Sequence, residues 1–192
     1  MTPGTDIEIS ARLEITRSLE GGESLLWTGV PRQGLFLRAA DVLMIPFSLI
    51  WGGFAFFWEW GVLHSAAPFF FRLWGIPFVA AGVYIILGRF FADSYARSKT
   101  CYGLTDRRVL VRSGVFSRAT NSLPLRTLNG ITLRERADGT GTISFGTPNP
   151  FSSWYAGSSW PGMGRYQVPS FDQIPDVKRV HDQILEAQRK AR

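Results

Sequence analysis

The sequence contains one cysteine and two histidines in 192 residues, which limits the chemistry that the chain can carry. Cys101 has no partner for an internal disulfide, and it lies far in the sequence from His64 and His181, so no Cys/His metal cluster is expected. The sequence also lacks GxSxG, HExxH and CxxC motifs and any phosphate-binding loop that ends in Lys-Ser/Thr. We therefore expect no metal, no cofactor and no enzymatic activity.

Apolar residues are abundant instead. Hydrophobic residues make up 45% of the chain and aromatic residues 14%, with 15 Phe and 7 Trp. Residues 42–58 and 73–88 contain no charge, and these runs extend to 39–60 and 68–91 with charged residues only near their ends. About 20 helical residues cross the ~30 Å hydrocarbon core of a bilayer. We predict a transmembrane helical hairpin over 39–91; two buried helices in a soluble core are the less favoured alternative.

Small residues inside these runs predict where the two helices touch. Without a hydrophobic driving force in lipid, helices associate through close packing at small side chains. The residues of this kind are Gly52, Gly53, Ala80, Ala81 and Gly82. We expect the helices to pack closely at these positions.

The distribution of charge predicts how the hairpin is oriented. Residues 1–38 carry a net charge of −1, residues 39–91 of zero and residues 92–192 of +7. Positive residues favour the cytoplasmic side of a membrane, and the link between the helices has none before Arg72. We expect both termini in the cytoplasm. The N-terminus is polar and of mixed charge, so no cleaved signal peptide is expected.

The segments outside the hairpin predict a small antiparallel β domain. Residues 92–192 contain short runs typical of strands at 100–104, 109–113, 117–125, 130–136 and 140–145, followed by a helical pattern over 174–190. Asp138-Gly139 between two of these runs favours a hairpin turn. The cytoplasmic segment 1–38 has the pattern of a short amphipathic helix over 6–19 and a strand over 24–28. We expect a membrane α+β protein whose β domain is a barrel or sandwich with a C-terminal helix.

A loop between the last predicted strand and the helix is rich in aromatic residues. Residues 147–171 are dense in Gly, Ser and Pro but also hold several large rings, which is unusual for a flexible linker. The rings proposed as a partner-binding surface are Trp154, Tyr155, Trp160 and Tyr166. They could equally cover an open end of the barrel or lie among lipid headgroups.

Residues 104–114, LTDRRVLVRSG, carry a resemblance to a known family. Preceded by Thr100-Cys101-Tyr102 and by two apolar spans, this segment resembles the TYxLTDxRVLxxSG pattern of bacterial membrane-anchored PH-like (pleckstrin-homology-like) domains. GESLLWTGVPRQGLFLR, upstream of the spans, is also similar to the lead-in of such proteins. The similar regions cover about 21–146 and the final helix. The resemblance implies a bacterial inner-membrane protein and a PH-like fold, which can bind peptides, proteins or lipids.

Within this motif, ordinary chemistry predicts a turn and a strand rather than a catalytic centre. Thr105 and Asp106 favour a reversal of the chain in which each bonds its own backbone, and Arg108 and Arg112 can face solvent while Val109 and Val111 face the core. Asp106 has no second carboxylate, His or Ser at an informative spacing.

The basic residues favour membrane lipid over nucleic acid. They are spread over strands and helix and form no recognised nucleic-acid motif. We predict that an anionic lipid surface is contacted by Arg97, Lys99, Arg107, Arg108 and Arg112.

We therefore expect a non-catalytic inner-membrane PH-like protein that binds a protein partner, as an accessory or assembly subunit of a membrane complex. Two alternatives stay open. One is an anionic-lipid-binding domain. The other is a membrane-bound enzyme that uses Asp106, Asp138 or His181.

Overall fold

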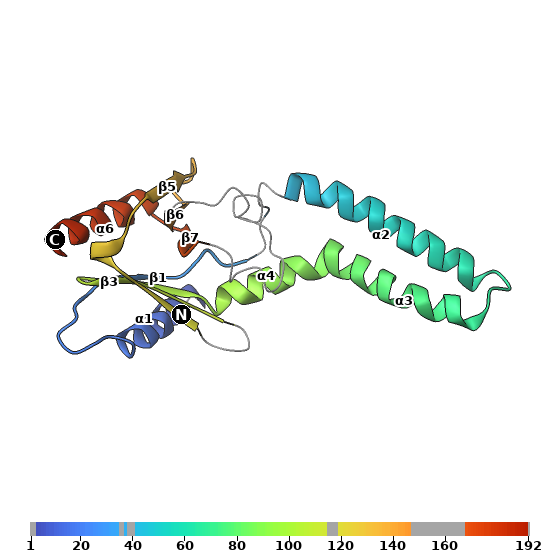
Figure 1. Ribbon diagram of the computed structural model, residues 1–192, viewed down its shortest axis with the longest axis horizontal. Helices are drawn as coiled ribbons and strands as arrows, with labels where there is room; N and C mark the ends of the chain where they lie inside the picture. The colour runs from blue at the N-terminus through green and yellow to red at the C-terminus, as the bar shows by residue number, and fades with distance from the viewer. Residues whose placement is uncertain (1–2, 35–36, 38–40, 115–118, 147–167, 192) are drawn as a thin grey trace. The chain divides into compact units, whose positions relative to one another are not determined.

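The structure is a computed structural model that describes residues 3–34, 37, 41–114, 119–146 and 168–191 (Figure 1). The chain forms two compact units. The described residues between 35 and 93 belong to one unit, and all other described residues belong to the other. Described residues of the N-terminal segment up to Gly34 belong to the same unit as the domain that follows the apolar helices.

The first sheet of the β unit combines a strand that precedes the apolar helices in the sequence with three strands that follow them. Its strand order is β1-β2-β3-β4, with β1 (Leu25–Gly29), β2 (Cys101–Thr105), β3 (Arg108–Ser113) and β4 (Ala119–Pro124), all antiparallel. The four strands lie at the positions expected from the sequence. β1 precedes the apolar helices and pairs with β2, which follows them.

The second sheet contains one strand that the sequence pattern did not predict. Its order is β5-β6-β7, with β5 (Ile131–Glu135), β6 (Gly141–Phe145) and β7 (Ser170–Ile174). Gly139 has φ +74 in the predicted turn between β5 and β6, a conformation that favours glycine. β7 occupies residues assigned from the sequence to the aromatic loop and the start of the C-terminal helix. Positive φ at Gln173 (55) and Asp176 (46) interrupts the chain there, so helix α6 spans Val177–Ala191.

Two apolar clusters hold the β unit together. The larger one includes buried side chains of β2, β3, β6, β7 and α6, and Phe171 at its centre has its ring 4.8–5.4 Å from those of Trp27, Tyr102 and Phe145. The smaller one lies under helix α1 (Pro3–Thr16), where Ile15 packs with Cys101 and Leu110. Both faces of β3 are therefore covered, and the prediction that one face meets solvent is wrong.

The predicted α+β class is observed, with two small antiparallel sheets and a C-terminal helix. A closed barrel, one of the two forms expected, is not formed among the described strands, because β4 and β5 do not pair.

The second unit contains the first apolar helix and the second one as far as Asp93. Helix α2 spans Asp41–Leu63. The second helix runs without a break from Phe69 to Ser98 as α3 (Phe69–Val83), a π-helical turn (Tyr84–Gly88) and α4 (Arg89–Ser98). Both are long and apolar enough to cross a membrane. The helix continues for seven residues beyond the predicted span, which ends at residue 91, through polar residues of α4.

The two apolar helices approach each other closely at Gly52 and Gly82, two of the five small residues predicted to lie at their contact. A Cβ placed on Gly82 would lie 3.3 Å from the Cα of Gly52, whereas a Cβ on Gly53 would meet nothing within 4 Å.

We expect Gly82→Leu to lower the thermal unfolding midpoint of the chain in detergent, because overpacking costs about 1–3 kcal/mol. Gly53→Leu is the matched control and should leave the midpoint unchanged. Equal effects of the two variants would contradict this packing.

Candidate functional site

The LTDRR motif forms an ion-pair network with the segment before β1. Arg108 binds the Glu23 carboxylate at both oxygens, through Nε at 2.9 Å and Nη2 at 2.8 Å, and reaches Glu20 at 2.8 Å. The Thr105 hydroxyl donates to Glu23 at 2.7 Å and accepts from the backbone N–H of Arg108 at 2.9 Å. We call these four residues (Glu20, Glu23, Thr105 and Arg108) the Arg108 clasp. It ties the α1–β1 connection to the β2–β3 turn.

Asp106 takes part in the same connection but not as its sequence suggested. Its Oδ1 accepts the backbone N–H of Ser24 at 2.9 Å, and its own N–H donates to the Ser24 carbonyl at 3.0 Å. Thr105 bonds the backbone of its own turn, as expected, whereas Asp106 bonds Ser24, the residue just before β1. Both residues therefore fix the N-terminal segment on the sheet.

The clasp shifts the pKa of Glu23. Burial alone raises this pKa, but the hydrogen bonds from Arg108, the Glu20 backbone and Thr105, with the Arg108 charge, outweigh burial and lower it from 4.5 to about 2. The ionised carboxylate is thus the form that the fold stabilises.

This shift predicts loss of stability in acid. A depressed carboxyl pKa contributes stability that is present above the unfolded value and is lost as pH falls from about 4.5 to about 2. We expect a contribution of about 3 kcal/mol to disappear over this range, measured by urea unfolding in detergent at several pH values. Glu23→Gln should remove this component of the pH dependence. An unchanged slope in that variant would contradict the assignment.

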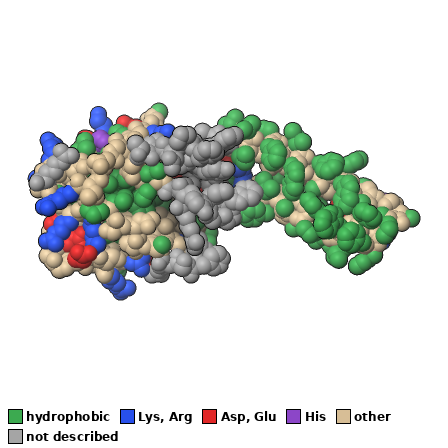
Figure 2. Space-filling model, viewed as in Figure 1, with side chains coloured by type: hydrophobic (Ala, Val, Ile, Leu, Met, Phe, Trp, Pro, Cys, Tyr) green, Lys and Arg blue, Asp and Glu red, His purple; other side chains and the backbone are tan. Residues whose placement is uncertain are grey.

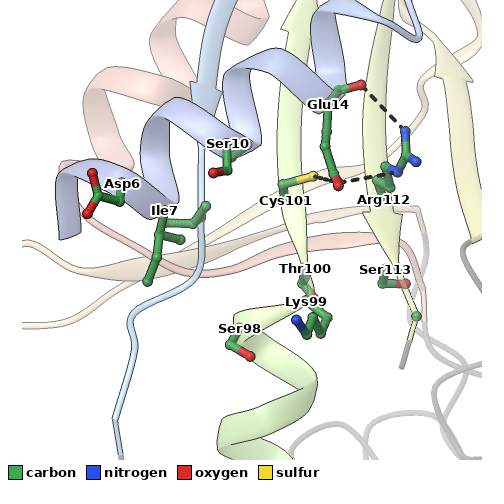
Figure 3. A pocket seen from close by; sticks show the side chains of 13 residues that line it. Asp6, Ile7, Ser10, Glu14, Ser98, Lys99, Thr100, Cys101, Arg112 and Ser113 are labelled. Atoms are coloured by element: carbon green, nitrogen blue, oxygen red, sulfur yellow. Dashed lines mark hydrogen bonds and ion pairs between the residues drawn. The ribbon is translucent and has the colours of Figure 1, made fainter. Parts of the chain in front are cut away.

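A cavity of about 320 Å³ lies in the same unit, between α1, the end of α4 and the ends of β2 and β3 (Figure 3). Its volume is at the lower end of the range for small-molecule sites. Charged side chains of both signs line it: Asp6 and Glu14 from α1, Lys99 after α4 and Arg112 from β3. Figure 3 shows Glu14 between Cys101 and Arg112, with the Cys101 Sγ 4.0 Å from its Oε2 and the Arg112 Nε at 3.5 Å.

Apolar side chains, among them Ile7 and Val30, line this cavity together with the charged ones. The described part of the chain contains no group of three or more His, Cys, Asp or Glu side chains able to hold a metal ion. The Glu14–Arg112 pair lines the cavity together with Ser10, Ser98 and Thr100. The Ser98 and Thr100 hydroxyls already donate to the carbonyls of Tyr95 and Ala96.

The five cations predicted to contact lipid divide into two groups. Arg97 is 5% exposed and donates to the Gly34 carbonyl, while Arg108 and Arg112 are held by Glu23 and Glu14. Lys99 and Arg107 are exposed, and the Lys99 ammonium lies 5.7 Å from the centre of the Tyr95 ring. The structure does not gather the five into one patch.

The four rings predicted to bind a partner, Trp154, Tyr155, Trp160 and Tyr166, lie outside the described residues. The three residues considered for an enzyme are described. Asp106 bonds Ser24, Asp138 pairs with Arg32 at 3.0 Å, and His181 is 3.5 Å from Asp182.

An ion pair lies within the helical unit. Arg89 and Asp41 are 2.9 Å apart, with side chains 10% and 6% exposed. These are two of the charged residues near the ends of the predicted apolar runs, and they neutralise each other between the helices. Sequence reasoning missed three acidic partners of the arginines, because no pattern marks which arginine each acid meets. They are Glu14, Glu20 and Glu23.

Comparison with known proteins supplies the identity of the fold. A family model described as "Bacterial PH domain" matches residues 39–188. No curated protein and no solved structure matches the chain at a significant level. The match includes the apolar helices, the LTDRR motif and α6, and it covers well over half of the sequence. The chain, with its two sheets closed by a C-terminal helix, therefore belongs to the bacterial PH domain family.

Proposed function

We propose that this chain is a membrane-anchored, non-catalytic PH-like protein of the bacterial inner membrane that binds a protein partner, as an accessory or assembly subunit of a membrane complex. The hairpin of α2 and α3–α4 is its anchor. The β unit and both termini lie in the cytoplasm.

The observation that carries the proposal is the apolar surface of the helical unit. Large side chains on α2 and α3 are strongly exposed, among them Val42 (79%), Phe57 (77%) and Phe69 (77%). Figure 2 shows hydrophobic side chains over the visible face of these helices. A soluble protein rarely exposes a contiguous apolar surface of this kind, and a bilayer removes it from water.

Strand pairing supports the same-side placement of both ends of the hairpin. β1 lies before α2, and its Thr28 and Gly29 pair with Gly103 and Tyr102 of β2, after α4. Strands pair only within one compartment, so the chain must cross the membrane an even number of times between them. The Lys and Arg excess of residues 92–192 favours the cytoplasm as that compartment.

Extraction and topology experiments test the anchor. Alkaline carbonate should leave the full chain in the membrane pellet, and a reporter active only in the periplasm should be silent when fused to either terminus and active when inserted near His64, in the α2–α3 link. Release by carbonate, or a terminal fusion active in the periplasm, would refute the anchor.

Partner binding is tested by affinity purification from mild-detergent membranes with mass spectrometry. We expect a co-purifying membrane protein that is lost from the Trp154→Ala/Trp160→Ala variant. Leu26→Ala, a change at an exposed apolar residue of β1, is the control and should retain the partner. Recovery of no partner from wild type would contradict the proposal.

Anionic lipid is a second candidate ligand because Lys99 and Arg107 stay exposed beside paired arginines. Each cation near an anionic surface contributes about 1 kcal/mol. The Lys99→Gln/Arg107→Gln variant of the full chain, purified in detergent, should then bind fewer anionic-lipid vesicles than wild type at low salt. Equal binding by the two proteins would remove lipid as a candidate.

A further inference from the structure

Among the described strands, β4 lies at the edge of its sheet and lacks the usual protection. Edge strands normally carry charges, bulges or prolines, since an open row of backbone groups pairs with other chains. β1 has a bulge between Leu25 and Trp27, β5 carries Arg134 and Glu135, and β7 has a register shift. β4, with the sequence ATNSLP, has no charge, pairs with β3 over six residues without a shift, and has proline only at its last position.

Backbone geometry identifies the groups on the open side of β4. The Leu125 N–H donates to the Arg107 carbonyl at 2.8 Å, so residues 107 and 125 form a hydrogen-bonded pair. Hydrogen-bonded and non-hydrogen-bonded pairs alternate in an antiparallel ladder. With the observed register, Ala119, Asn121 and Leu123 therefore bond β3, and the N–H and C=O groups of Thr120 and Ser122 point away from it. Thr120, Asn121 and Ser122 are all exposed, and β3 is the one described strand that pairs with β4.

We propose that β4 pairs antiparallel with β4 of a second copy of this chain, so that the two four-stranded sheets join into one. One register pairs the outward N–H groups of both Thr120 and Ser122. It places Thr120 opposite the second copy's Ser122. Asn121 then faces Asn121 of the second copy across the two-fold axis, as a non-hydrogen-bonded pair. Four backbone hydrogen bonds form, two from each copy.

The charge and the side chains of this edge favour a second copy over another occupant. Antiparallel edges are self-complementary, and a two-fold interface brings each group against its own equivalent. β4 carries no charge to repel itself, and the neighbouring Arg108 and Arg112 are neutralised by Glu23 and Glu14. An asparagine amide both donates and accepts, so it can bond its own copy, and Thr–Ser cross-strand pairs are favourable.

Six residues of strand bury less area than a stable soluble dimer needs, so the pairing is weak in dilute solution. Tethering both copies in one membrane would raise their effective concentration. The strength of the dimer, although not its geometry, thus rests on the proposed anchor.

Disulfide trapping in native membranes tests the pairing. The full chain with Asn121→Cys and Cys101→Ser should form a disulfide-linked dimer on mild oxidation, because a non-hydrogen-bonded antiparallel pair holds its Cα atoms about 4.5 Å apart. Ala119→Cys in the same background is the matched control. In this register its equivalent on the second copy is displaced by about 13 Å along the strand, so little dimer should form.

A proline substitution distinguishes an effect on edge-to-edge pairing from an effect on the stability of the fold. Adding Ser122→Pro to the Asn121→Cys variant removes an outward N–H that β3 does not use, and it should cut dimer yield at least about tenfold. The Ser122 hydroxyl also accepts from Arg108 Nη1 at 3.3 Å in an exposed contact, so the unfolding midpoint should fall only slightly. Thr120→Lys, which keeps every backbone donor within the fold, should also reduce the yield.

Several results would overturn the pairing. They are an absent dimer at position 121, equal dimer at positions 119 and 121, full yield in both the proline and the lysine variants, or an adduct of position 121 with another protein. Loss of membrane anchoring in the extraction experiment would be seen separately, since it moves the chain to the supernatant whichever residue carries the cysteine.

Discussion

Glu23→Ala is expected to lower the free energy of unfolding of the β unit by about 3 kcal/mol. The Glu23 side chain is 1% exposed and binds both the Nε and Nη2 of Arg108, whose own side chain is 17% exposed. Removing the acid leaves a largely buried guanidinium without its main partner, which costs more than the pair itself contributes. Urea unfolding of the full chain in nonionic detergent at neutral pH measures the effect.

Glu20→Ala is the matched control for this prediction. Glu20 also touches Arg108, at 2.8 Å, but its side chain is 69% exposed. Exposed pairs contribute about 0–1 kcal/mol, so this variant should unfold close to wild type. The Glu23→Ala/Arg108→Ala double variant should be less unstable than the sum of the single changes, because neither charge is then left alone. Similar losses for Glu20→Ala and Glu23→Ala would contradict the clasp.

Asp41→Ala is expected to destabilise the helical unit by about 3–5 kcal/mol. Its carboxylate is 2.9 Å from the Arg89 guanidinium, and both side chains are buried. Loss of the acid leaves an uncompensated cation between two apolar helices. Stability in mixed micelles, titrated from nonionic detergent to dodecyl sulfate, is the appropriate measurement.

The double variant Asp41→Leu/Arg89→Leu provides the control. Replacing both members of a buried pair by apolar groups of similar size is often neutral or stabilising. We therefore expect the double variant to recover most of the stability lost in Asp41→Ala. A double variant as unstable as the single one would show that the pair is not the cause.

Much of the fold could be predicted because its patterns are local. The apolar runs specify α2 and α3, and the Asp138-Gly139 turn specifies the β5–β6 hairpin, since helix length and turn type depend on neighbouring residues. β7 was missed because its five residues follow an aromatic, glycine-rich segment. It also contains a residue with positive φ, Gln173, and glutamine does not predict that conformation. The extra length of the second helix was missed because α4 is polar.

The candidate site was harder to predict because its contacts are long-range. The sequence correctly predicts a strand that contains Arg108 and Arg112. Strand alternation alone, however, predicts that both side chains face solvent. Helix α1 covers that face and brings Glu14 against Arg112 across a separation of 98 residues. Sequence spacing contains no information about which element covers which face of a sheet, and so the acids that bind these arginines could not be named.

The interrupted sheet also sets an order of events during synthesis. β1 leaves the ribosome about seventy residues before β2, its neighbour in the sheet. At about 5–20 residues per second, β1 waits for several seconds while the apolar helices are made and delivered to the translocation machinery. Until β2 follows, Trp27 has neither its strand partner nor Phe171 to pack against. A chaperone bound to the nascent chain would therefore find this short segment accessible for longer than any other strand of the domain.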